Sequence, residues 1–173
     1  RARRSTKRAS GPLDTRSISD PALNMRRIRT RKTPPTLIGW REWAAFPDLG
    51  AERIKAKIDT GAKTSAIHAR KITTHMRAGV LWAEFLLHPV QKKRLPEIRC
   101  AAPVADRRNV RSSNGREEMR YIVHTTLRFG GREWVIELSL ANRDQMGFRL
   151  LLGRDALRKK FIIDPGQSFL LGK

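Results

Sequence analysis

The sequence predicts a mainly β protein with one globular domain, because three observations agree after residue 36. Apolar residues alternate with polar residues in several runs, glycine-containing turn signals join these runs, and only one short segment has a helical composition. A chain of 173 residues is long enough for one good core. We therefore expect a β domain over residues 36–173, preceded by a tail over residues 1–35.

The tail differs from the rest of the chain in composition. It is rich in Arg, Ser and Thr, shows no hydrophobic periodicity and ends in Lys32-Thr33-Pro34-Pro35, which is typical of a disordered segment. Its Arg-rich, acid-poor composition also resembles an organelle transit peptide, although no amphipathic helix is evident. Met25 would be a sensible natural start, so whether residues 1–24 belong to the mature protein stays open.

Period-two alternation predicts the half-buried strands of the domain. The apolar positions of the first run, residues 53–58, are Ile54, Ala56 and Ile58, and residues 81–87 and 134–140 alternate in the same way. Two turn signals predict tight hairpins: Gly130-Gly131 joins two such runs, and Asn114-Gly115 lies between residues 110–113 and 116–121.

The end of the chain predicts the single helix and two further strands. Residues 156–160, after Gly153, have the composition of a short helix. Residues 161–163 and 168–171 are apolar and separated by Asp164-Pro165-Gly166, which predicts two terminal strands joined by a turn.

Charge is the most unusual bulk property, with 37 Lys and Arg residues against 16 Asp and Glu residues and a net charge of +21. Residues 1–32 contain 11 basic and 2 acidic side chains, so the globular part is also strongly basic. A basic domain implies a polyanionic partner, such as nucleic acid, the ribosome, an acidic membrane or an acidic peptide. Trp40, Trp43, Trp82 and Trp134 are expected to be core or interface anchors.

The compartment is predicted from what the sequence lacks. Cys100 is the single cysteine, so an intrachain disulfide is impossible and nothing indicates an oxidising compartment. No apolar run approaches the roughly 20 residues that span a bilayer. We therefore expect a protein that does not insert into a membrane and lies in a reducing cytosol or organelle matrix, and of these we predict the cytoplasm.

Asp59-Thr60-Gly61 follows the first predicted strand and is the main candidate for catalysis. An aspartate that activates water must be held in a fixed direction, and a turn directly after a strand provides this. The threonine hydroxyl can hydrogen-bond around the turn, and glycine lets the backbone approach the carboxylate without a Cβ atom. An ordinary strand-ending turn would give the same tripeptide.

One carboxylate is insufficient for this chemistry, since a general acid and a general base must act together. Asp14-Thr15 is followed by arginine and Asp155 by alanine, so the chain has no second motif of this type. A two-fold homodimer would place one Asp59 from each chain at its axis, where the two carboxylates share one proton. The sequence therefore predicts a dimer that is obligatory for activity.

Three segments, residues 38–43, 54–66 and 142–149, together with Leu150-Leu151-Leu152-Gly153-Arg154-Asp155, closely resemble one bacterial family. It is the retropepsin-like family of aspartic peptidases that carries the label "ATP-dependent zinc protease" and includes the RimB peptidases. The likeness runs from Ile38 to Leu171. It implies a closed acid-protease barrel that forms a two-fold homodimer, with a hairpin flap from each chain over a shared active site.

The resemblance also implies a role for individual residues. Asp59 would be the catalytic base and acid, Thr60 and Gly61 its turn, and residues 110–117 the flap. Structural support would come from Thr64, Gly153, Arg154 and Asp155. Lys63 stands where retroviral relatives carry an acid, so the expected pairing of that acid with Arg154 is absent here. The residues expected to bind an acidic substrate are Ala62, Lys63, Arg107, Arg108, Arg111, Ser112 and Arg116. A solvated basic face is the alternative for each arginine.

Members of the RimB type are linked to ATP-grasp ligases that add glutamates to a small-subunit ribosomal protein, and they are understood to trim these tails. The resemblance thus implies a dimeric aspartic endopeptidase that acts on an acidic peptide or a glutamate-tailed ribosomal protein. The alternative is a basic RNA- or ribosome-binding module on the same fold. An inactive dimeric scaffold is a third possibility, because a complete motif does not prove turnover.

No metal or cofactor is expected. The chain contains no His-Glu-x-x-His motif, and His68, His75, His88 and His124 show no spacing typical of a zinc site. It also lacks a glycine-rich phosphate loop followed by lysine and serine or threonine. Any ATP dependence would belong to a ligase partner.

Overall fold

The computed structural model describes residues 34–111, 115, 117–144 and 146–172, which belong to one compact unit. These residues form ten strands, one α-helix and one 3-10 turn, so the prediction of a mainly β domain is confirmed. The predicted tail lies outside the described residues apart from its last two, Pro34 and Pro35. None of the helices formed by the described residues has the length and apolar character that crossing a membrane requires.

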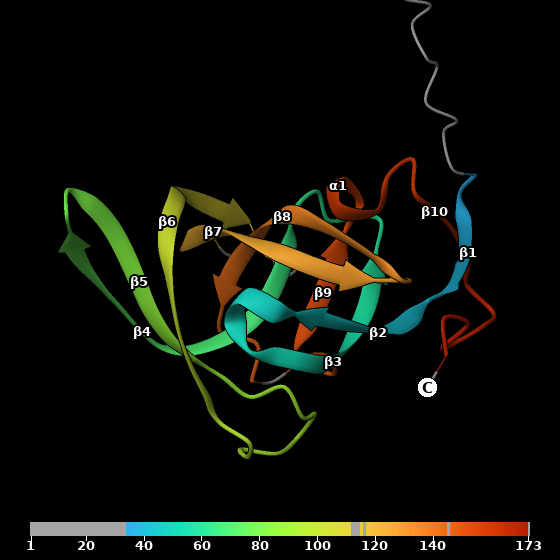
Figure 1. The fold of residues 1–173 in the computed structure, drawn as a ribbon, viewed down its shortest axis with the longest axis horizontal. Helices are drawn as coiled ribbons and strands as arrows, with labels where there is room; N and C mark the ends of the chain where they lie inside the picture. Colours follow the sequence, from blue (N-terminus) through green and yellow to red (C-terminus); the bar gives the residue numbers. More distant parts are fainter. Residues whose placement is uncertain (1–33, 112–114, 116, 145, 173) are drawn as a thin grey trace, which may run out of the picture. The chain divides into compact units, whose positions relative to one another are not determined.

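Two sheets organise the domain. β1 (Thr36–Gly39) pairs in parallel with β10 (Phe161–Asp164). The other eight strands form one sheet in the order β2-β3-β9-β4-β5-β6-β7-β8, with additional pairings between β2 and β7 and between β4 and β8. Their bounds are β2 Arg41–Phe46, β3 Ala51–Asp59, β4 Ser65–Arg77, β5 Val80–Leu87, β6 Ile98–Arg111, β7 Glu117–Phe129, β8 Arg132–Ala141 and β9 Leu150–Gly153. Figure 1 shows β1 and β10 at one end of the domain and the β4–β5 hairpin at the other.

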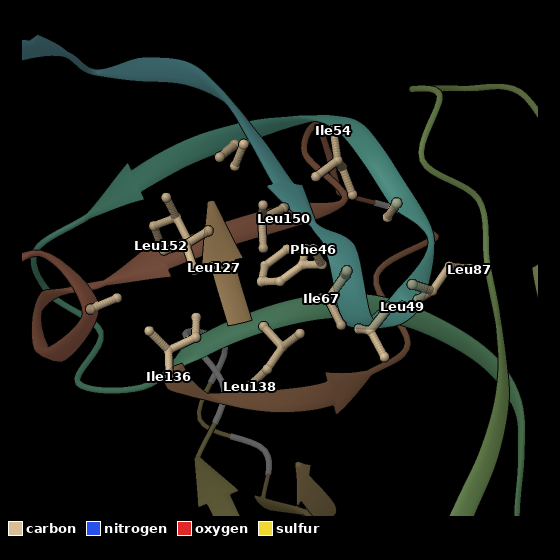
Figure 2. Packing of buried hydrophobic residues seen from close by; sticks show 14 of the residues in the cluster. Phe46, Leu49, Ile54, Ile67, Leu87, Leu127, Ile136, Leu138, Leu150 and Leu152 are labelled. Carbon is tan, nitrogen blue, oxygen red and sulfur yellow. The ribbon is translucent and has the colours of Figure 1, made fainter. Parts of the chain in front are cut away.

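The core lies between the strands that carry the predicted alternation. In β3, Ile54, Ala56 and Ile58 are buried while the residues between them face outward, which is the period of a pleated strand. Figure 2 shows side chains from several strands meeting in this interior, among them Phe46, Ile67, Leu127, Leu138 and Leu150. The 3-10 turn η2 (Pro47–Leu49) buries Leu49 in the same cluster.

The two predicted hairpins are confirmed as strand pairs. Gly130 and Gly131 have φ values of +59° and +70° and connect the paired residues Phe129 and Arg132, and two consecutive positive φ values are the geometry of a tight hairpin turn. The second hairpin joins β6 and β7, which pair up to Arg111 and Glu117. Of its turn, Gly115 is described, with φ of +79°, and Asn114 lies outside the described residues.

Two predicted elements near the C-terminus are corrected. The helix α1 comprises Arg154–Leu157, earlier than the predicted residues 156–160, because Arg158 leaves the helical region with ψ of 140° and Lys159 has φ of +65°. The strand predicted over residues 168–171 is absent from this described segment. Phe169 has φ of +58°, which interrupts an extended chain, although its N–H group still donates to the Arg41 carbonyl at 2.9 Å.

Candidate active site

Asp59 is the last residue of β3, and the turn that follows holds its carboxylate through main-chain donors. The N–H groups of Gly61 and Ala62 donate to Asp59 Oδ1 at 3.1 and 3.2 Å. A Cβ atom at Gly61 would lie only 3.3 Å from the same oxygen, so glycine keeps this approach open. The residue is partly exposed. The arrangement therefore presents a carboxylate in a fixed direction at the surface.

β9 lies parallel to β3 and supports this turn from behind. Gly153 is the partner of Asp59 in the register of the two strands. A Cβ atom at Gly153 would lie 2.7 Å from the Lys63 carbonyl oxygen and 2.7 Å from the Thr64 carbonyl carbon. Real Cβ atoms do not approach backbone this closely, so only glycine lets residues 63–64 cross β9 at this point. Ser65 completes the crossing, because its Oγ accepts the Gly153 N–H group at 3.1 Å.

The first turn of α1 fastens the other side of the Asp59 turn. The Arg154 side chain donates from one nitrogen to the carbonyl oxygens of Thr60 and Gly61 at 3.1 and 3.2 Å. The N–H groups of Arg154 and Asp155 donate to the carbonyls of Ala62 and Lys63 at 2.9 and 3.1 Å. Arg154 thus binds the turn itself. It does not pair with an acid at position 63, because this chain has Lys63 there.

One buried arginine, Arg143, interacts electrostatically with Asp59, and a second, Arg120, interacts with Arg143. Arg120 on β7 and Arg143 after β8 are 8% exposed each. Burial lowers the pKa of the Arg143 guanidinium, the charge of Arg120 lowers it further, and the charge of Asp59 raises it. The Arg120 Nε group donates to Glu118 at 2.9 Å. The charge of Asp59 therefore interacts with that of the buried Arg143, and the charge of Arg120 interacts with that of Arg143.

A buried histidine holds Arg143 in place. His68 on β4 accepts the Arg143 main-chain N–H group on Nδ1 at 2.9 Å, and its Nε2 lies 3.1 Å from Asp144 Oδ1. The Arg143 Nε group also donates to the Phe148 carbonyl at 3.2 Å. Neutral His68 therefore carries its proton on Nε2, toward the carboxylate.

The surroundings of His68 keep it neutral. Burial lowers its pKa to about 4, and the charge of Arg149 contributes in the same direction. Asp144 opposes this shift, while His88 and Arg70 add to it. The side chain of His68 is fully buried, so burial outweighs the single nearby carboxylate.

The structure brings together part of the predicted site. Asp59, Thr60, Gly61, Ala62, Lys63 and Thr64 form one turn, and Gly153, Arg154 and Asp155 contact it. The basic residues expected to bind substrate are more dispersed. Arg107 is exposed on β6, whereas Arg108 pairs with Asp106 at 2.6 Å and with Glu137 at 3.0 Å. The Arg111 side chain, Ser112 and Arg116 lie outside the described residues.

Sequence reasoning missed Arg143. In the sequence it is one of 37 basic residues, and no spacing relates it to Asp59. The signal that could have indicated Arg143 is its position directly after an alternating apolar strand, within the segment 142–149 that carries the family resemblance. Within the described residues, no group of three His, Cys, Asp or Glu side chains is placed to hold a metal ion.

Several curated relatives match the described domain. Proteins named "Probable alpha-L-glutamate ligase" from Shewanella pealeana and Desulfotalea psychrophila are 50% and 47% identical to this chain over 137 residues. Each match covers 79% of this chain and 30% of the relative, so the chain spans less than a third of the length of these relatives.

A solved structure and a family description agree on the fold. The crystal structure of Lpg0085, a protein of unknown function from Legionella pneumophila, matches with a TM-score of 0.66 and 25% identity, covering 79% of this chain and 98% of that one. Residues 37–173 match the family described as "RimB-like: Retropepsin-like aspartic endopeptidase RimB", as the sequence resemblance predicts. The chain therefore belongs to the RimB-like family of retropepsin-like proteins.

Proposed function

We propose that this protein is an aspartic endopeptidase whose active site contains one Asp59 from each of two chains. The observation that carries the proposal is the fixed, partly exposed carboxylate at the end of β3. Within the described residues, hydrogen bonds engage only its Oδ1 atom, which leaves Oδ2 for a water molecule. The membership of a family described as aspartic endopeptidases supports the same reaction.

In this mechanism two Asp59 carboxylates share one proton at the two-fold axis. The ionised carboxylate takes a proton from water, whose oxygen attacks the scissile carbonyl, while the protonated partner gives its proton to the carbonyl oxygen. The resulting tetrahedral species collapses when the peptide nitrogen accepts a proton and its bond to carbon breaks. Each chain supplies one acid or base, so a monomer has half of the required pair.

The dimer and the closed barrel are part of the proposal. The additional pairings of β2 with β7 and of β4 with β8 support a sheet that closes on itself. The β6–β7 hairpin is the flap in this proposal, and its closure over a bound peptide would exclude water from the two carboxylates.

We further propose that the substrate is acidic, with a poly-glutamate tail as the leading candidate. Arg143 supports this choice, since its charge interacts with that of Asp59 and guanidinium groups pair well with glutamate side chains. The relatives point to the same chemistry, because this domain matches a part of proteins named as glutamate ligases. An enzyme that removes glutamate would act on the product of such a ligase.

The test is mass spectrometry of glutamate-tailed and neutral peptides incubated with wild-type and Asp59→Asn proteins. We expect cleavage of the glutamate tail by the wild type and a loss of at least about 10³-fold in Asp59→Asn. A chelator should leave the wild-type rate unchanged. Equal activity in both proteins would remove Asp59 from the catalytic role.

A mixing experiment tests the shared site. Wild-type chains are equilibrated with an excess of Asp59→Asn chains, and cleavage is measured per wild-type chain. If the two carboxylates of one active site come from two different chains, activity per wild-type chain falls as mixed dimers form. Activity that stays constant per wild-type chain would show that one chain is sufficient.

A second proposal is that the basic domain binds RNA or the ribosome, which the net charge of +21 supports. It predicts an RNA affinity that falls steeply with salt and survives Asp59→Asn. Removal of residues 1–35 separates the contribution of the tail from that of the domain.

A further inference from the structure

The outward face of β3 carries cations at every second position up to Asp59. Arg53, Lys55 and Lys57 point away from the core, on the face opposite Ile54, Ala56 and Ile58. Arg41 of β2 lies beside Lys57 in the register of the two strands. We call Arg41, Arg53, Lys55 and Lys57 the cationic stripe. Asp59 follows Lys57 on the same strand, two positions further along.

Aromatic rings hold the far part of this stripe. The Arg53 guanidinium carbon lies 4.1 Å from the ring centroid of Trp43, and the Lys55 ammonium nitrogen lies 5.5 Å from the same centroid. Trp43 also stacks on Phe169, with 5.5 Å between the ring centroids. These cation–π contacts orient the positive groups without neutralising them.

The stripe has no acidic partners among the described residues. The ion pairs of that part of the chain engage other cations, such as Arg128 with Glu52 and Glu133. Arg41 donates instead to the Ser168 hydroxyl at 3.0 Å and lies over Trp40 and Phe169. Four positive charges therefore face outward along β2 and β3, on the strand that leads to Asp59, and their counter-charge must come from solvent ions or from a ligand.

The spacing of the stripe suits an extended acidic peptide. Residues two apart on a strand are separated by about 6.6–6.8 Å, and the side chains that share one side of an extended peptide have the same repeat. From Arg53 to Asp59 the strand β3 spans about 20 Å. A run of glutamates could thus place successive carboxylates against successive cations while another part of the same chain lies at Asp59.

We propose that the cationic stripe is a docking track that holds the part of an acidic tail lying beyond the cleaved bond. This inference rests on the proposed peptidase function and adds a binding surface outside the catalytic pair. A peptide fits the surface better than RNA does, because bases need free aromatic faces for stacking. Trp43 is already in contact with Arg53 and stacked on Phe169.

The test compares a short glutamate peptide with one that extends far enough past the cleaved bond to reach Arg53, which requires about six further residues. In the wild type we expect a lower KM for the longer peptide. Arg53→Gln with Lys55→Gln should raise the KM of the longer peptide about 3-fold to 10-fold and abolish the difference between the two peptides.

Two control proteins separate the track from bulk charge and from packing. Arg94→Gln with Arg99→Gln removes the same charge at exposed positions away from β3 and should keep the wild-type difference. Arg53→Lys with Lys55→Arg keeps both charges and should also keep it. Circular dichroism verifies that each variant is folded.

Each failure has a separate meaning. Absence of cleavage of the short peptide by the wild type would overturn the peptidase function itself. Cleavage of both peptides with the same KM difference in the Arg53→Gln, Lys55→Gln protein would overturn the track alone. An equal KM increase in the Arg94→Gln, Arg99→Gln control would attribute the effect to net charge. A loss of affinity for single-stranded RNA in the stripe variant, with an unchanged peptide KM, would assign the surface to RNA.

Discussion

The Asp59 turn and the His68 cluster both adjoin β4, yet they are held by different means. Mainly main-chain groups hold the turn, together with the Arg154 side chain: the Asp59 carboxylate accepts two N–H groups, and residues 62 and 63 accept two more from α1. Side chains hold the cluster, in which His68 contacts Arg143 and Asp144. The turn is partly exposed, whereas His68 and Arg143 are buried.

The difference reflects two separate requirements of the site, which are to orient an exposed carboxylate and to stabilise a buried cation. A carboxylate that meets water and substrate has to be oriented without being enclosed, and backbone donors achieve this because they need no additional side chain. A cation whose charge interacts with that of the carboxylate must be kept in place although burial disfavours its charge, and a hydrogen-bonded network provides that support. Changes in the turn should therefore affect chemistry and packing sharply, and changes in the cluster should act through Arg143 and through pH.

The largest effect is expected at Gly153, where residues 63–64 cross β9 behind the Asp59 turn. Gly153→Ala places a Cβ atom 2.7 Å from the backbone of residues 63 and 64, so the strands must separate. We expect a loss of about 2–3 kcal/mol in the free energy of unfolding, together with most of the activity. Chemical denaturation measures the first and peptide cleavage the second. Gly147→Ala is the matched control, since a Cβ atom there meets nothing within 4 Å. A stable, active Gly153→Ala protein would contradict the inference that only glycine lets residues 63–64 cross β9.

The His68 cluster should make stability depend on pH. The pKa of His68 is about 4 in the folded protein and about 6.5 in an unfolded chain. Between these values the unfolded chain binds a proton that the folded protein does not, so the free energy of unfolding falls as the pH drops from about 6.5 to 4. The contribution is on the order of 3 kcal/mol.

His68→Gln should flatten this part of the pH profile, because glutamine can still accept the Arg143 N–H group but does not titrate. Denaturation at several pH values measures the slope. His124→Gln changes an exposed histidine and is the control. A slope that is the same in wild type and His68→Gln would show that other groups cause the pH dependence.

Arg143 links the two regions, and its replacement tests substrate recognition. We expect Arg143→Gln to raise the KM for a glutamate-tailed peptide about 10-fold, which corresponds to the loss of a charged hydrogen bond. The KM for a neutral peptide should change less, and Arg143→Lys should recover part of the difference. Arg99→Gln is the control for net charge. A parallel change for both peptides would indicate that Arg143 acts only on the shape of the loop.

The smallest effect is expected at Arg108, which sequence reasoning assigned to the substrate. Because this side chain already pairs with Asp106 and Glu137, Arg108→Gln should change the KM less than about 2-fold and stability by less than about 1 kcal/mol. Steady-state kinetics with the glutamate-tailed peptide checks the first value. A larger KM increase would return Arg108 to the binding site.

The features of the fold that could be predicted from the sequence were those that depend on residues close together in the chain. The alternation in β3 and the Gly130-Gly131 turn were recognised correctly, since a strand period and two positive φ values depend on local sequence. The strand expected over residues 168–171 failed for a tertiary reason: that segment lies against β2, where Glu42 Oε1 accepts the Leu170 N–H group at 2.8 Å and Phe169 turns onto Trp43.

By itself, the sequence determined the alternating strands such as β3, the turn motif at Asp59 and the family, because each depends on residues that are close together in the chain. Only the tertiary structure decided which basic residue interacts with the carboxylate. Arg143 is held by His68, 75 residues earlier in the chain, while Arg108 is occupied by Asp106 and Glu137. Such contacts arise when β4, β7 and β8 pair, and in a chain with 37 basic residues no local pattern distinguishes a guanidinium group beside the active site from one engaged elsewhere.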